Sequence, residues 1–213
     1  MHILMGLGNP GPKYDRTRHN IGFDFADRVA GDSNRALPGH VGAWKLEAKS
    51  LTRKITLAGL SLLIVKPQTY MNLSGEAAQQ LLQFYKISPR NLIVVVDDIY
   101  LELGALRIRT QGSHGGHNGL RNLMEHCGDE FTRVRIGVGP LPPDQDKADF
   151  VLRKYGAEES KVLDSVLTQA QSIVETGLSL GWERAGSNFN RRSGLPGQSG
   201  SPGVSGPSGG STT

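Results

Sequence analysis

The feature that most constrains the fold of this chain is an unbroken apolar run that ends in two acidic residues. Residues 92–96 read Leu-Ile-Val-Val-Val and are followed directly by Asp97 and Asp98. A short run rich in β-branched residues predicts a strand that is buried on both faces of a sheet. Ligands of open α/β sheets gather at the carboxyl ends of strands. Asp97 is therefore a candidate site residue, although an acidic residue here can also simply cap the next turn.

Strand-like and helix-like patterns alternate along the rest of the chain. Further strands are predicted at 1–7, in three short runs within 43–66, at 105–109 and at 134–138. Helical spacing of apolar residues begins near Asn20, after a predicted N-cap at Ser74, near 120–127 and over about 157–180. This alternation predicts the α/β class, with a single domain, a mixed β-sheet flanked by helices on both faces and a long C-terminal helix.

The bulk composition is that of a globular protein of the cytoplasm. The chain has 213 residues, 37% of them hydrophobic, and no apolar run approaches a membrane span. The N-terminus lacks the basic and apolar regions of a signal peptide. Cys127 is the only cysteine and falls on the apolar side of a helix pattern, so we expect it to pack in the core. We therefore expect no membrane association. The sequence leaves the oligomeric state open, and a monomer is the default expectation.

The last part of the chain has a different composition. Residues 193–213 are almost wholly Ser, Gly, Pro and Thr and carry no charge. Such a segment cannot bury enough apolar surface to offset the entropy lost on ordering. The sequence therefore predicts a folded domain at 1–192 and a disordered tail at 193–213.

Two histidine-asparagine pairs carry the strongest chemical signal. His19-Asn20 lies within 17–22, and His117-Asn118 lies within 114–120. Each pair is close to glycine and opens a helical pattern. A neutral imidazole is a proton acceptor and a carboxamide is a hydrogen-bonding group, so the pairs indicate one site assembled from distant segments.

Two alternative readings of these segments are weaker. Residues 6–11 match the GxGxxG pattern, but Pro12 follows at once and helical spacing begins only near residue 20, so a dinucleotide-binding turn is rejected. His114 and His117, with Asp97 and Asp98, could form a metal site. The intervening glycines argue against a fixed set of ligands.

The sequence offers no nucleophilic side chain in a recognised setting. The Gly-x-Ser-x-Gly pattern is absent, and Cys127 is expected in the core. A carboxylate beside a histidine fixes its tautomer and makes it a usable general base. If His19 is catalytic, we therefore expect it to activate water directly.

Basic charge gathers near the second histidine-asparagine pair. Residues 105–139 hold five arginines against three acidic residues, and no lysine. Arginine forms forked contacts with phosphate, so this cluster indicates a polyanionic substrate.

Together these segments resemble the bacterial-type peptidyl-tRNA hydrolase family. The matching stretches keep family order and are 6–11, 14–27, 66–75, 96–98, 115–120 and 133–139. The two histidine-asparagine segments are the most specific of these matches. The resemblance implies hydrolysis of the ester that joins a peptide to the 3′ ribose of tRNA, with peptidyl-tRNA as partner and with no metal or other cofactor.

The resemblance also implies a role for individual residues. His19 is the implied general base, Asp97 its orienting partner, and Asn9 a residue that positions substrate or water. The implied substrate contacts are Tyr14, Met71, Asn72, His117 and Asn118, with Met71 lining the peptide groove and with Arg107, Arg109 and Arg135 clamping tRNA phosphate.

The chain departs from the family pattern at 98–104, where many relatives have an acidic-leucine-acidic-proline pattern. This leaves the shape of that loop open. A second hypothesis is a catalytically idle RNA-binding relative of the same fold, but every matched polar position of the site is present.

Overall fold

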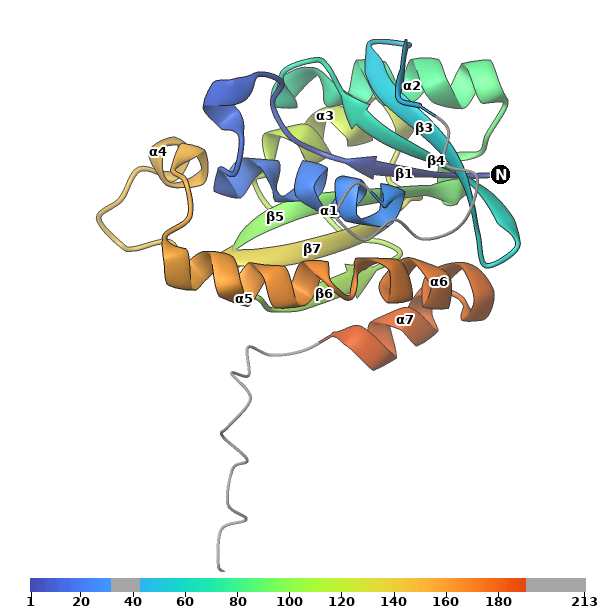
Figure 1. Cartoon of the computed structure of the whole chain (residues 1–213). Coiled ribbons are helices and arrows are strands. Elements are labelled where there is room, and N and C mark those ends of the chain that lie inside the picture. Colours follow the sequence, from blue (N-terminus) through green and yellow to red (C-terminus); the bar gives the residue numbers. More distant parts are fainter. Residues whose placement is uncertain (32–42, 191–213) are drawn as a thin grey trace, which may run out of the picture.

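The computed structural model describes residues 1–31 and 43–190, which form a layered α/β structure around one sheet (Figure 1). The seven strands of these residues lie in the order β2-β3-β4-β1-β5-β7-β6. Their bounds are β1 His2–Gly6, β2 Lys45–Glu47, β3 Ser50–Leu57, β4 Leu60–Pro67, β5 Leu92–Glu102, β6 Leu106–Arg109 and β7 Thr132–Gly139. The central strands β4, β1, β5 and β7 are parallel, and β2, β3 and β6 add antiparallel edges.

Helices cover both faces of the sheet. Their bounds are α1 Ile21–Ala30, α2 Ser74–Tyr85, α3 Asn118–Cys127, α4 Lys147–Leu152, α5 Ala157–Leu167, α6 Ala170–Leu180 and α7 Trp182–Phe189. Helices α2 and α3 pack on one face, and α1, α5, α6 and α7 pack on the other (Figure 1). The short helix α4 stands beyond the carboxyl ends of the parallel strands (Figure 1). The predicted fold class is confirmed.

The apolar run of β5 occupies the centre of the sheet, as predicted. Alternate side chains enter opposite cores: Ile93 and Val95 pack toward α1, whereas Val94 and Val96 pack toward α2 and α3. All four are at most 1% exposed. Burial on both faces is why this strand reads as an unbroken apolar run.

Helix α1 lies unusually close to the strands beneath it. A Cβ built on Gly22 would stand 2.4 Å from the Leu7 carbonyl oxygen and 2.5 Å from that of Val95. A Cβ on Gly6 would stand 2.0 Å from the Gly22 carbonyl oxygen. These glycines therefore serve backbone packing. Because α1 begins at Ile21, the rejection of a dinucleotide-binding turn is confirmed.

The C-terminal helical region differs in detail from the prediction. The region 157–180 is helical except at residues 168–169, where a turn divides it into α5 and α6. The Ser165 carbonyl accepts the Thr168 hydroxyl at 2.8 Å and the Gln169 side-chain amide at 2.9 Å, while the Gln169 N–H bonds to the Val166 carbonyl at 3.0 Å. Side chains that compete for a backbone acceptor tighten the turn locally and interrupt the helix.

Three further predictions concern the N-cap of α2, the setting of Cys127 and the segment 98–104. Ser74 is not the N-cap of α2: the cap is Leu73, because a 3-10 turn at Met71–Leu73 precedes the helix and the Ser74 hydroxyl donates to the Met71 carbonyl at 2.9 Å. Cys127 packs against the core beside α2, as predicted, and burial raises the pKa of its thiol to about 11. Of the departing segment 98–104, residues 98–102 continue β5 with an irregular register against β7, and residues 103–104 form a turn.

The predicted tail at 193–213 lies outside the described residues, so the domain boundary at 192 stays a prediction. Within 1–31 and 43–190, no helix combines the length and apolar character needed to cross a membrane.

Candidate active site

A pocket of about 620 Å³ opens at the carboxyl ends of the parallel strands. It brings together eight of the residues that the sequence had indicated, namely Asn9, His19, Met71, Asn72, Asp97, His117, Asn118 and Arg135. Tyr14, Arg107 and Arg109 are not part of its lining. Strands from distant parts of the chain end at one edge of the sheet, and this is why the predicted residues converge.

The backbone around His19 is fixed by the side chains of its two neighbours, Arg18 and Asn20. It lies in a 3-10 turn, Arg18–Asn20, directly before α1. The Asn20 side chain accepts from the Asn9 N–H and donates to the Asn9 carbonyl, both at 2.9 Å. The buried Arg18 guanidinium lies 4.5 Å from the Phe150 ring centroid and forms an ion pair with Glu159. The amide of Asn20 is thus occupied in fixing the backbone and is not available to a substrate.

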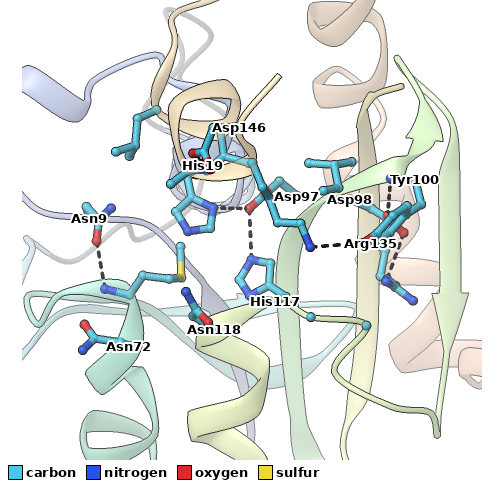
Figure 2. A pocket seen from close by; sticks show the side chains of 18 of the residues that line it. Asn9, His19, Asn72, Asp97, Asp98, Tyr100, His117, Asn118, Arg135 and Asp146 are labelled. Carbon is cyan, nitrogen blue, oxygen red and sulfur yellow. Dashed lines mark hydrogen bonds and ion pairs between the residues drawn. The ribbon is translucent and has the colours of Figure 1, made fainter. Parts of the chain in front are cut away.

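One oxygen of Asp97 joins the two predicted histidines. Asp97 Oδ1 lies 2.8 Å from His19 Nδ1 and 3.0 Å from His117 Nε2 (Figure 2). His117 Nδ1 accepts the Leu120 N–H at 3.2 Å and thereby caps α3. His117 Nδ1 therefore carries no proton, so Nε2–H donates to Asp97. If His19 likewise donates Nδ1–H to Asp97, its Nε2 is left as an unprotonated acceptor.

Asp97 and His19 shift each other's pKa values in favour of their charged forms. Burial by itself raises the pKa of Asp97, but the facing His19 and His117 outweigh burial and hold that pKa well below its usual range. Burial by itself lowers the pKa of His19, but the Asp97 carboxylate outweighs it and raises the pKa above its ordinary value of 6.5. Asp97 therefore stays ionised, and His19 becomes a stronger base than a free imidazole.

Three asparagines lie around the same part of the pocket (Figure 2). Asn9 Oδ1 accepts the Met71 N–H at 2.8 Å, and Asn118 Oδ1 accepts from Arg121 at 3.0 Å. Both carbonyl groups are thus occupied, and within the described residues neither Nδ2 has a partner. Asn72 is exposed at the pocket wall. The asparagines can therefore offer N–H donors to a bound group, and Asn9 can position a substrate only through Nδ2.

The possible metal ligands are not those that the sequence spacing indicated. Within the described residues, one atom each of His19, Asp97 and His117 lies within 4.8 Å of the others, whereas His114 instead accepts the Gly116 N–H at 3.0 Å. A metal would need the proton on His117 Nε2 to move to Nδ1, which faces the Leu120 N–H donor. The hydrogen bonds suit a base and its carboxylate better than a metal site.

The predicted arginines occupy two different settings. Arg135 lines the pocket and pairs with Asp98 at 3.0 Å. Arg107 lies opposite Arg135 in the β6–β7 ladder, and both Arg107 and Arg109 are exposed while the intervening Ile108 is buried. The prediction that Arg107 and Arg109 share one face of a strand is therefore confirmed. Their contact with phosphate stays a prediction.

The pocket lining differs from the predicted set at several residues. The ring of Tyr14, which is not part of the lining, lies 6.4 Å from that of Tyr70, which does line the pocket. Tyr70 precedes the predicted Met71 and could have been found by that position. Tyr100 and Lys147 also line the pocket. The helix that carries Lys147 has only six residues, too few for a periodic pattern.

The fold and the site together define an α/β protein whose pocket holds two histidines on one buried carboxylate. Comparison with known proteins gives the family. A family model described as peptidyl-tRNA hydrolase matches residues 3–196. The chain belongs to the peptidyl-tRNA hydrolase family, which confirms the resemblance.

Individual relatives agree with this assignment. A peptidyl-tRNA hydrolase of Lachnoclostridium phytofermentans is 44% identical over 193 residues, which are 90% of this chain and 98% of the relative. One of Alkaliphilus oremlandii is 46% identical over 177 residues, 83% of this chain and 92% of the relative. The crystal structure of peptidyl-tRNA hydrolase from Acinetobacter baumannii matches with a TM-score of 0.82 at 30% identity, covering 90% of this chain and 95% of that chain.

Proposed function

We propose that this protein hydrolyses the ester bond between the peptide and the 3′ ribose of tRNA in peptidyl-tRNA, and so releases free tRNA for translation. The observation that carries the proposal is His19, which faces the pocket and is held by the ionised Asp97 in a chain of this family. A neutral imidazole whose other nitrogen is tied to a carboxylate is suited to general-base catalysis.

The chemical step follows from this geometry. His19 Nε2 takes a proton from water as the water oxygen attacks the ester carbonyl, and the Asp97 carboxylate stabilises the imidazolium that forms. The bond between the carbonyl carbon and the ribose 3′ oxygen then breaks, and the proton passes from His19 to that oxygen. The free amide N–H groups of Asn9 and Asn118 are the proposed donors to the oxyanion. No step calls for a metal or other cofactor.

The rest of the pocket is assigned to the substrate. Met71 forms an apolar wall for the peptide, Asn72 and His117 border it, and Tyr14 supports the wall through Tyr70. Arg135 in the pocket and Arg107 and Arg109 beside it supply phosphate contacts. The proposal includes a monomer that acts in the cytoplasm.

The alternative function is binding of RNA without catalysis. Burying a charge such as the Asp97 carboxylate costs desolvation free energy even when histidines pair with it, and binding of RNA alone does not require such a group. The intact cluster therefore favours the enzyme.

A turnover assay with peptidyl-tRNA tests the proposal. The parent protein should release peptide and tRNA, and His19→Ala should lose roughly 10²–10⁴-fold in kcat, the range for a lost general base, while tRNA binding is retained. A variant within a few-fold of the parent would remove His19 from the mechanism. A parent protein that binds tRNA without turnover would favour the idle alternative.

A further inference from the structure

Lys147 is a pocket-lining cation that the mechanism does not use. It is the first residue of α4, and its backbone is fixed because the Asp146 carboxylate caps the helix by accepting the Ala148 and Asp149 N–H groups at 2.8 and 3.0 Å. Within the described residues, no carboxylate pairs with its ammonium. The other pocket cation, Arg135, is by contrast paired with a buried aspartate.

The Lys147 ammonium is held by a single neutral group. Nζ donates to the Tyr100 hydroxyl at 3.1 Å and lies 5.4 Å from the centroid of that ring. Tyr100 belongs to β5 and is 65% exposed. An ammonium has three N–H donors, so this contact leaves two for a ligand. The contact joins α4 to the strand that carries Asp97, and both residues line the pocket.

The loop before α3 leaves room for both cations. A Cβ on Gly116 would lie 3.3 Å from Lys147 Nζ, and a Cβ on Gly115 would lie 2.7 Å from Arg135 Nη2. Both glycines have positive φ, 56° for Gly115 and 77° for Gly116. Any side chain here would be strained and would crowd the cation. Two cations thus stand above consecutive glycines, in the pocket that also holds His19.

We propose that Lys147 binds the phosphate on the 5′ side of the terminal nucleoside of the substrate, with Tyr100 as its positioning residue. The inference rests on the proposed function. Only one ribose separates the peptide ester from this phosphate. A substrate with its ester at His19 therefore brings its nearest anion within the same pocket. Lys147 serves this phosphate, whereas Arg107 and Arg109 lie outside the pocket and serve phosphates further along the tRNA.

Three substrates of increasing length isolate the contact. A peptidyl ester of adenosine has no phosphate, the ester of the dinucleotide CpA has one phosphodiester beside the terminal nucleoside, and peptidyl-tRNA has them all. Lys147→Gln should raise KM for the dinucleotide and the tRNA by roughly twofold to fivefold with kcat unchanged, the size of an exposed charge contact. It should leave the adenosine ester unaffected. Lys147→Arg should retain most of the parent's affinity, because the positive charge remains.

Matched variants complete the experiment. Lys161→Gln removes an exposed helical lysine on α5 and should change neither KM nor kcat for any of the three substrates. Tyr100→Phe keeps the ring but removes the hydroxyl, so it should raise KM for the dinucleotide in the same direction as Lys147→Gln, by a smaller factor.

The outcomes separate this inference from the proposed function. Equal losses of Lys147→Gln on the adenosine and dinucleotide esters, or no loss on either, would overturn the phosphate contact while the parent's turnover stands. A parent inactive on all three substrates would overturn the proposed function instead. Binding of a non-hydrolysable 3′-amide analogue of the dinucleotide, compared between parent and Lys147→Gln by calorimetry, decides the contact even then: a weaker variant supports it and equal affinities refute it.

Discussion

At the residue scale, a single carboxylate oxygen positions both histidines of the site. Asp97 Oδ1 receives both His19 and His117, and the two contacts hold the carboxylate in its ionised form within a buried site. The two histidines are not equivalent: His117 also caps α3 with Nδ1, so its ring is fixed at both ends. His19 is tied at one end only, which leaves one of its nitrogens for proton transfer.

The first prediction concerns pH. Because the carboxylate raises the pKa of His19 above 6.5, the protonated, inactive imidazole persists to higher pH, and kcat/KM should fall as pH drops through a value above 6.5. Asp97→Asn removes the charge, so this acid limb should move to lower pH and the maximum rate should fall by roughly 10²–10⁴-fold. Profiles from about pH 5 to about pH 9 test both effects. An acid limb that does not move in Asp97→Asn would contradict the assignment, with the exposed Asp164→Asn as control.

The second prediction concerns metal ions. The protons between His19, Asp97 and His117 already satisfy the three groups, so a chelator should leave turnover unchanged. The measurement compares kcat/KM before and after dialysis against chelator, with added divalent ions as a check. Full loss of activity that a divalent ion restores would show that these side chains are metal ligands after all.

At the scale of elements, the site depends on how closely α1 approaches the strands. Gly22 in α1 stands over Leu7 and Val95, so the helix axis lies nearer the sheet than any side chain would allow. This contact sets the position of the turn that carries His19, because that turn leads directly into α1. The position of His19 is thus a consequence of helix-on-strand packing.

Gly22→Ala should therefore destabilise the protein. The new methyl group would meet backbone atoms at 2.4–2.5 Å, and backbone cannot rotate away as a side chain can. We expect a loss of about 2–4 kcal/mol in the free energy of unfolding, measured by urea denaturation. Gly156→Ala is the matched control, because its nearest neighbour is Glu159 Oε2 at 3.6 Å and the change should stay within about 1 kcal/mol. Similar values for the two variants would refute this account of α1.

At the scale of the whole molecule, both edges of the sheet carry exposed basic side chains, but only the β6 edge adjoins a strand that lines the pocket. The β6 edge presents Arg107 and Arg109 beside the pocket, and the opposite edge formed by β2 and β3 presents Lys45 and Lys54 far from it. If the ester of peptidyl-tRNA lies in the pocket, the tRNA can extend along the β6 edge. Arg107 and Arg109 would neutralise its phosphates there.

Replacement of Arg107 and Arg109 with alanine should weaken peptidyl-tRNA binding and flatten its salt dependence, because fewer counterions are released. The rate on a peptidyl ester of adenosine should be nearly unchanged. The measurement is kcat/KM for both substrates at two salt concentrations. Lys45→Ala with Lys54→Ala removes equal charge from the other edge and should have little effect. Equal losses on the long and short substrates would show that Arg107 and Arg109 serve the fold or the chemical site.

Local pattern by itself predicted most of the strands and helices, but not α4 or α7, and it indicated much of the site. The run at 92–96 predicted the central strand because a strand buried on both faces must be apolar at every position. The histidine-asparagine segments drew attention to His19 and His117 through residue type and neighbouring glycines. Their assignment to a base and its substrate came from the family resemblance.

Only the tertiary structure decided which groups meet. Asp97 Oδ1 joins two histidines that lie 78 and 20 residues away, and such distances carry no local signal. It also decided that the Asn20 side chain binds the Asn9 backbone rather than a substrate, and that Lys147 binds the Tyr100 hydroxyl. Sequence periodicity reports which side of an element is buried, whereas contacts between elements depend on strand order, and strand order is a property of the whole chain.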